Sequence, residues 1–180
     1  MVFSVSQRLQ PHITCGWYTA HMRIGIISDT HGNLPTAVHQ IFAGVDHIIH
    51  AGDIGGQCIL DELELIAPVT AVYGNCDYPS DYLTATATAS LNLCGQRIFI
   101  AHKPEQIQEA LSGKGALPPG SPLPHICIHG HTHIPHNAYA GAVLMLCPGS
   151  PVKPLGGSQP SLMLLALEQQ RPPQAESITL

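Results

Sequence analysis

Five short polar blocks, each placed directly after an apolar run, constrain the fold of this chain more than any other feature. The first three apolar runs, at 23–28, 46–51 and 69–73, have the length and β-branched content of buried strands. Amphipathic segments at 34–43 and 57–66 separate these runs and have the apolar spacing of helices. This β-α-β-α-β order predicts a parallel sheet with right-handed crossovers.

The second half of the chain predicts a different arrangement. Residues 86–93 and 97–101 flank Cys94-Gly95-Gln96 and are typical of a hairpin. A helix at about 104–112, a loop at 113–124 and a strand at 125–129 follow, and 137–140, 142–147 and 161–168 look like antiparallel strands that close a second sheet. We therefore expect two packed sheets flanked by helices in a single domain of residues 22–180, with residues 1–21 as an N-terminal extension or tail.

Length and composition limit the possible functions. A chain of 180 residues with 44% apolar content is long enough to bury a real core. Charged residues make up 11%, Lys and Arg number seven, and the net charge is about -5, so a nucleic-acid polymer is not an expected partner. No run approaches the roughly 18 apolar residues of a membrane span. The six cysteines lack close paired spacing and no secretory signal is visible, which indicates a reduced, cytoplasmic protein.

The five polar blocks carry seven side chains that can bind metal ions. They are Asp29, His31, Asp53, Asn75, His102, His131 and His133. Because parallel strands present their carboxyl ends at one crevice, we expect these side chains to converge. Asp29 and His31 are two residues apart, as are His131 and His133, and in an extended chain both members of such a pair point to the same side.

The donor types predict a centre with two metal ions. Asp53 is the natural bridging carboxylate, since one oxygen can serve each ion. With two carboxylates, two divalent ions would keep a formal charge near +2, which suits a hydroxide and an incoming phosphate oxygen. Nitrogen and oxygen donors in these proportions suit manganese, iron, zinc, nickel or cobalt better than calcium or magnesium.

The blocks Asp29-x-His31, Gly52-Asp53, Gly74-Asn75-Cys76-Asp77, His102 and Gly130-His131-x-His133 closely resemble those of the calcineurin-like metallophosphoesterases. The resemblance covers roughly residues 22–170 and is nearest to the small bacterial and archaeal phosphodiesterases. It implies an α/β fold, a four-layer α/β/β/α sandwich with two mixed β-sheets flanked by helices. It further implies that one ion binds Asp29, His31, Asp53 and His133 and the other binds Asp53, Asn75, His102 and His131. A hydroxide bridging the two ions would then attack phosphorus.

The residues after the third strand are the candidate catalytic group, Asn75, Cys76 and Asp77. Many larger members of the family have His where this chain has Cys76, and a thiol with a pKa of ~8.5 is a poorer proton donor or oxyanion partner. Asp77 either positions leaving-group chemistry or caps the turn before Tyr78. Cys147 stands where the family more often has Asn, and no role is assigned to it.

One further histidine is a candidate for a supporting role. His50 lies three residues before Asp53, where it either orients a ligand or meets a backbone partner at the strand end. Both alternatives are open from the sequence.

Together these features predict a cytoplasmic, metal-dependent phosphodiesterase or phosphatase with two divalent ions, for which manganese is expected. The low basic content favours a small phosphate ester as substrate over a polymer. The alternative is a metal-binding protein-interaction scaffold of the same fold with weak catalysis, which Cys76 and the lack of an obvious Arg substrate clamp keep open. A homo-oligomer is compatible with the sequence.

Overall fold

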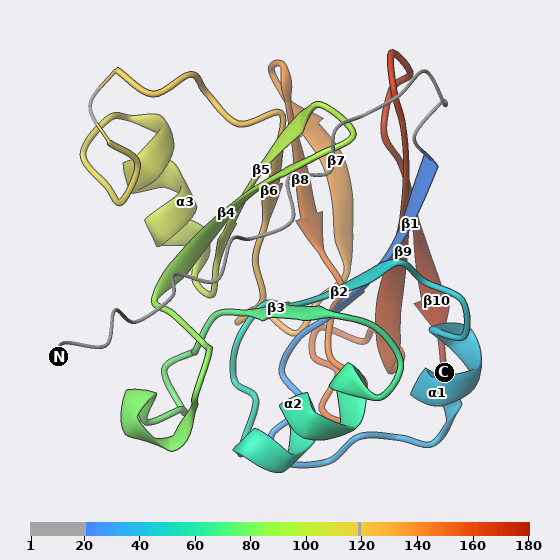
Figure 1. Ribbon diagram of the computed structural model, residues 1–180. Helices are drawn as coiled ribbons and strands as arrows, with labels where there is room; N and C mark the ends of the chain where they lie inside the picture. Colours follow the sequence, from blue (N-terminus) through green and yellow to red (C-terminus); the bar gives the residue numbers. More distant parts are fainter. Residues whose placement is uncertain (1–20, 119) are drawn as a thin grey trace, which may run out of the picture.

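Two five-stranded sheets form the centre of the protein in a computed structural model that describes residues 21–118 and 120–180 (Figure 1). The first sheet has the spatial order β10 (Gln174–Thr179), β9 (Ser161–Glu168), β1 (His21–Ile27), β2 (His47–His50) and β3 (Val69–Ala71). The second has the order β4 (Thr88–Leu93), β5 (Gln96–Ala101), β6 (Ile126–Ile128), β8 (Val143–Cys147) and β7 (His136–Ala140). Each sheet is mixed, with parallel strands β1-β2-β3 in the first and β5-β6-β8 in the second.

The inner faces of the two sheets share one aliphatic core. Its members come from both sheets and include Ile24, Ile26, Ile49, Ile98, Ile100, Ile126, Ile128, Leu144, Leu146 and Leu165. In β1 the alternation is plain, because Ile24 and Ile26 face this core while Ile27 faces the opposite side. Each such side chain contributes about 1.5–3 kcal/mol when it leaves water, so the sheet-to-sheet contact is a large source of stability.

Helices cover the outer face of each sheet, with α3 on the opposite side of the molecule from α1 and α2 (Figure 1). The helices α1 (Ala37–Ile41) and α2 (Gln57–Glu64) place Val38, Leu60 and Leu63 against the first sheet. Helix α3 (Pro104–Leu111) places Ile107 and Ala110 against the second. The predicted four-layer α/β/β/α sandwich is therefore confirmed.

The segment 161–168 corrects one sequence prediction. It does not close the second sheet: it forms β9, which pairs antiparallel with β1 in the first sheet. In the second sheet, 143–147 forms β8, which is antiparallel to β7 but parallel to β6. Strand β10 has no counterpart in the sequence prediction, because its sequence is largely polar and most of its side chains are exposed.

Residues 1–20 of the predicted N-terminal extension lie outside the described residues, and residue 21 already belongs to β1. Within the described ranges, no helix has the length and apolar character needed to cross a bilayer.

Candidate metal centre

The polar blocks leave the carboxyl ends of β1, β2, β3, β5 and β6 and meet at one edge of the sandwich. Backbone hydrogen bonds join these loops to one another. The N–H of Asp29 donates to the Gly52 carbonyl at 2.9 Å, and the N–H of His31 donates to the Asp53 carbonyl at 3.0 Å. The N–H of Gly130 donates to the His102 carbonyl at 3.0 Å. The loops of each sheet are thus fixed in pairs before any ligand binds.

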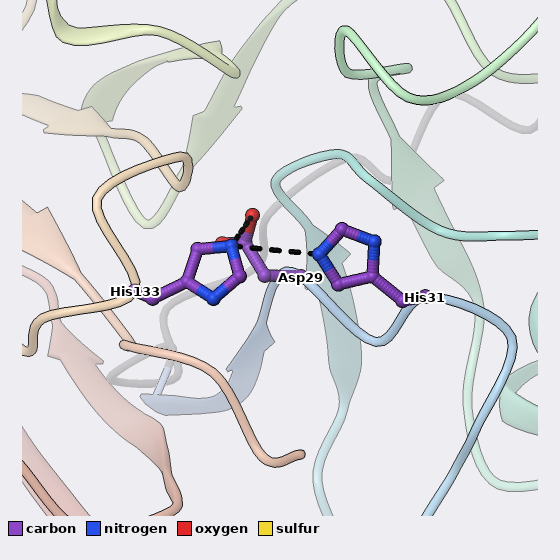
Figure 2. Close-up of side chains that lie close together, drawn as sticks. All are labelled: Asp29, His31 and His133. Atoms are coloured by element: carbon purple, nitrogen blue, oxygen red, sulfur yellow. Dashed lines mark hydrogen bonds and ion pairs between the residues drawn. The ribbon is translucent and has the colours of Figure 1, made fainter. Parts of the chain in front are cut away.

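Asp29, His31 and His133 form the first group of potential ligands. Figure 2 shows their side chains pointing toward one another. His133 Nε2 lies 3.3 Å from Asp29 Oδ1 and 3.4 Å from His31 Nε2. The other ring nitrogen, Nδ1, lies 2.5 Å from the Lys153 carbonyl oxygen, so its N–H donates there and the lone pair of Nε2 faces the group. One potential ligand atom from each residue lies within 4.8 Å of the other two.

Asp53 lies between two imidazoles from different sheets. Its Oδ2 is 3.9 Å from His31 Nε2, and its Oδ1 is 3.4 Å from His102 Nε2. Asp29, Asp53 and His102 form a second group of potential ligands with the same 4.8 Å spacing. The two oxygens of one carboxylate therefore face two different sets of donors, which is the arrangement that a bridging carboxylate needs.

His102 carries the clearest sign that a cation fits this site. The side chain is only 2% exposed, and its Nδ1 lies 2.8 Å from the Ala51 carbonyl oxygen, to which the N–H donates. Its Nε2 is buried and makes no well-formed hydrogen bond to the described residues. A buried polar atom without a partner costs about 1–3 kcal/mol, and a metal ion between His102 and Asp53 would remove that cost.

The structure also brings Asn75 and His131 to this edge. The His131 ring stands edge-on to that of His102, with ring centroids 5.2 Å apart, and its backbone N–H donates to Asp29 Oδ2 at 3.1 Å. Asn75 precedes Cys76, whose backbone N–H donates to Asp53 Oδ1 at 2.8 Å. The Asn75 amide nitrogen lies 3.4 Å from the Cys76 sulfur.

The backbone at five of the seven candidate ligands is left-handed. The φ angles are 56° at Asp29, 47° at His31, 52° at Asp53, 68° at His131 and 57° at His133. The pairs therefore do not lie in extended chain, and the expectation of period-two geometry was wrong. The side chains converge because the chain turns sharply at the strand ends, and Asp and His tolerate such turns better than most residues.

The carboxylates and imidazoles perturb one another's proton affinity. Burial raises the pKa of Asp29. Burial also acts to raise the pKa of Asp53, but the adjacent His102 ring and the hydrogen bond from the Cys76 N–H outweigh it and lower that pKa below its usual value. Burial lowers the pKa of His31 and His131, so both rings are neutral at pH 7 and offer lone pairs to a metal.

His102 is the exception among these histidines. Burial acts to lower its pKa, but the nearby Asp53 carboxylate and the hydrogen bond to the Ala51 carbonyl outweigh burial and raise it. The Asp53 carboxylate that favours the protonated ring of His102 favours any cation at this point.

The Asp77 carboxylate accepts four hydrogen bonds from other groups of the protein. Its Oδ2 accepts from the N–H groups of Gly74 at 2.8 Å and Ile54 at 3.0 Å. Its Oδ1 accepts from the Gly55 N–H at 3.0 Å and from the Tyr82 hydroxyl at 2.5 Å. Burial acts to raise the Asp77 pKa, but these donors lower it. Of the two predicted alternatives, the geometry favours the one in which Asp77 stabilises the turn.

Cys76, by contrast, is exposed. Its sulfur lies within 4.8 Å of a ring nitrogen of His31 and a carboxylate oxygen of Asp53. Its hydrogen bond to Asp53 raises the pKa of the thiol, which keeps the group protonated at neutral pH.

Two supporting residues hold the ligand loops. The Ser150 hydroxyl, which the sequence did not single out, donates to the Asp29 carbonyl at 2.8 Å and accepts from the Lys153 N–H at 2.9 Å. His50 is fully buried. Its Nδ1 accepts from the Gly52 N–H at 3.2 Å, and its Nε2 lies 2.9 Å from the Thr30 hydroxyl. Burial lowers its pKa to about 3, so it is a neutral residue that positions the backbone beside Asp53.

Comparisons with known proteins agree with this geometry. Residues 22–170 match a family model described as the calcineurin-like phosphoesterase superfamily domain. A probable metallophosphoesterase of Methanothermobacter thermautotrophicus is 32% identical over 161 residues, which cover 83% of this chain and 88% of the relative. Phosphodiesterase YfcE of Escherichia coli K12 is 30% identical over 171 residues, covering 80% of this chain and 87% of YfcE.

Solved structures show the same similarity in three dimensions. The structure of E. coli YfcE, described as a phosphoesterase, has a TM-score of 0.63 at 28% identity and covers 80% of this chain and 88% of its own. Vacuolar Protein Sorting 29 from Cryptosporidium parvum has a TM-score of 0.66 at 18% identity, covering 89% of this chain and 99% of its own. The second likeness concerns the fold alone.

Proposed function

Because the chain belongs to the calcineurin-like phosphoesterase superfamily, we propose that it is a phosphodiesterase that hydrolyses a small phosphate ester with two divalent metal ions. The observation that carries the proposal is the position of Asp53, whose two oxygens face His31 and His102 from different sheets. Such a carboxylate can serve two ions at once, as the two-metal mechanism requires.

The proposed ligands divide into two sets that share Asp53. One ion would be held by Asp29, His31, Asp53 and His133, and the other by Asp53, Asn75, His102 and His131. When bound, two such ions lower the pKa of water to supply a nucleophile at neutral pH and stabilise the charge on the phosphoryl oxygens.

The protein's own groups prepare the site for that chemistry. His102 and His133 donate their Nδ1 protons to the carbonyls of Ala51 and Lys153, which turns both Nε2 atoms toward the centre. The Cys76 N–H holds Asp53 Oδ1 at 2.8 Å and helps to keep this carboxylate ionised. The ligands are thus oriented by contacts that do not involve the substrate.

Metal identity, substrate size and compartment complete the proposal. Nitrogen and oxygen donors suit Mn²⁺, our proposed ion, and also iron, zinc, nickel and cobalt. With seven Lys and Arg in the whole sequence, a small ester is a better substrate than a polyanion. We propose the cytoplasm as compartment, because Cys58, Cys76, Cys127 and Cys147 carry free thiols.

The test is Mn²⁺-dependent hydrolysis of a generic aryl phosphodiester by the wild-type protein and by Asp53→Asn. We expect turnover in the wild type and a loss of at least about a hundredfold in the variant, because the shared ligand loses its charge. Asp61→Asn is the matched control, since Asp61 lies exposed on α2 and contacts Gln57. Absence of turnover with every divalent metal, or full activity of Asp53→Asn, would overturn the proposal.

The same assay separates this function from a weakly active interaction scaffold. The likeness to Vacuolar Protein Sorting 29 from Cryptosporidium parvum concerns the fold alone at 18% identity and does not favour the scaffold over catalysis. The presence of all seven candidate ligands in this sequence supports catalysis.

A further inference from the structure

Cys76 brings a sulfur atom to a centre where the sequence predicted nitrogen and oxygen donors alone. Its Sγ and the potential ligand atoms of His31 and Asp53 all lie within 4.8 Å of one another. The position is fixed, because the Cys76 N–H donates to Asp53 Oδ1 at 2.8 Å and the Asn75 amide approaches the sulfur at 3.4 Å. In the described part of the chain, Cys76 is the one cysteine that falls in such a three-residue group.

This group differs from the proposed ligand sets in the sheet that supplies its residues. His31, Asp53 and Cys76 follow β1, β2 and β3, three neighbouring strands of the first sheet. The group Asp29, His31 and His133 instead needs a ligand that follows β6 of the second sheet. An ion that prefers sulfur can therefore gain a donor from the first sheet without any contribution from the second.

Building on the proposed function, we propose that Cys76 is a metal ligand used selectively by thiophilic ions such as Zn²⁺, Co²⁺ and Cd²⁺. Thiolates favour such ions, whereas Mn²⁺ is satisfied by carboxylate, imidazole and water. When the metal–sulfur bond forms, the S–H bond breaks and its proton passes to solvent. Mn²⁺ leaves the thiol protonated and outside the ligand set.

The identity of the bound ion therefore determines whether Cys76 is one of its ligands. A thiophilic ion binds more tightly than its nitrogen and oxygen ligands alone would allow. The sulfur then fills a coordination position that substrate or water would otherwise use, so turnover with these ions is slower than with Mn²⁺. Cys76 thus selects the working metal.

The test is titration of the full-length protein with Co²⁺, followed by near-ultraviolet absorbance. We expect a thiolate-to-cobalt charge-transfer band in the wild type and in Cys58→Ser, and its loss in Cys76→Ser. Cys58 is the matched control because it is also exposed but lies on α2, outside the group. A band that survives in Cys76→Ser, or its absence from the wild type, would overturn the inference.

Affinity provides a second readout. Competition titrations should show that Cys76→Ser weakens Zn²⁺ and Cd²⁺ binding by at least about tenfold and leaves Mn²⁺ affinity almost unchanged. An equal loss for all three ions would mean that the variant disturbs Asp53 and not a metal–sulfur bond, and would count against the inference. Thermal unfolding of both serine variants establishes that they are folded.

The outcomes also separate this inference from the function on which it builds. A wild-type protein that hydrolyses the aryl phosphodiester with Mn²⁺ but gives no cobalt–thiolate band overturns the role of Cys76 and leaves the phosphodiesterase in place. A wild-type protein with the band and without hydrolysis in any divalent metal overturns the phosphodiesterase and leaves the thiolate ligand in place.

Discussion

Replacing Gly74 by alanine should displace the Asp53 carboxylate and press on the Asp53 backbone. Gly74 is not among the residues with a left-handed φ, so alanine can adopt its conformation. The added Cβ would lie 2.8 Å from Asp53 Cγ, where ordinary contacts begin at 3.4 Å, and it would collide with the nearer Asp53 Oδ1 and backbone nitrogen. Asp53 is 2% exposed, so the carboxylate has no open side into which it can retreat.

The size of the effect follows from this collision. The carboxylate must move by about 1 Å, and a misplacement of that size costs roughly a hundredfold in activity. Overpacking at a buried position lowers the free energy of unfolding by about 1–3 kcal/mol, which a protein of ordinary stability survives. We therefore expect a folded variant whose activity falls far more than its stability.

The assay is kcat/KM for Mn²⁺-dependent hydrolysis of the aryl phosphodiester, combined with metal content per chain and urea unfolding. Gly95→Ala is the control: Gly95 lies in the β4–β5 turn with φ 77° and nothing within 4 Å of an added Cβ. It should lose about 1–2 kcal/mol of stability from backbone strain and keep its activity. Wild-type kcat/KM in Gly74→Ala, or an equal loss in Gly95→Ala, would refute the reasoning.

Three further predictions test the supporting contacts. Ser150→Ala removes the hydroxyl that donates to the Asp29 carbonyl and should lower the free energy of unfolding by about 1–3 kcal/mol in urea titrations. Tyr82→Phe removes the donor to Asp77 Oδ1 and should cost about 1.5–3 kcal/mol, measured in the same way; an unchanged midpoint would contradict the role given to Asp77. Burial lowers the pKa of His50 to about 3, so between pH 6.5 and 3 only the unfolded chain binds this proton and stability falls as the pH falls. From pH 7 to pH 5 the wild type should lose about 2 kcal/mol more than His50→Gln, and equal losses would show that His50 is not buried as a neutral ring.

The convergence of the site could be predicted from the sequence because one geometric rule covers it. Asp29, Asp53 and Asn75 each follow a strand of the parallel β1-β2-β3 set, and parallel strands deliver their carboxyl ends to one edge. The same holds for His102 and His131 after β5 and β6 of the second sheet. The helices could also be predicted, because the apolar spacing that identifies a helix lies within the helix's own residues.

The pairing of β9 could not be predicted from its own residues. The segment Ser161–Glu168 is an apolar run that would suit either sheet, and its partner β1 lies far away in the sequence at His21–Ile27. Rules that favour neighbouring strands assign it to the nearer sheet, and here the packing of the whole core decides otherwise. Ser150 escaped notice for a similar reason, since its partner Asp29 is 121 residues away.

The backbone supplies an argument for function that does not depend on ligand chemistry. Among the described residues, seven that are not glycine have a left-handed φ. Cys94 belongs to the β4–β5 turn and Gln170 to the loop between β9 and β10, so ordinary turns account for these two. The other five are all candidate metal ligands.

Left-handed backbone costs an ordinary residue roughly 1–2 kcal/mol, so five such residues at one edge of the sandwich lower the stability of the fold. The fold retains them through contacts that fix each turn: the N–H groups of Asp29 and His31 donate to the β2 loop, and that of His131 donates to the Asp29 carboxylate. Strain that is supported in this way concentrates at functional sites. Here it turns each strand end sharply enough to aim carboxylates and imidazoles from two sheets at a common point.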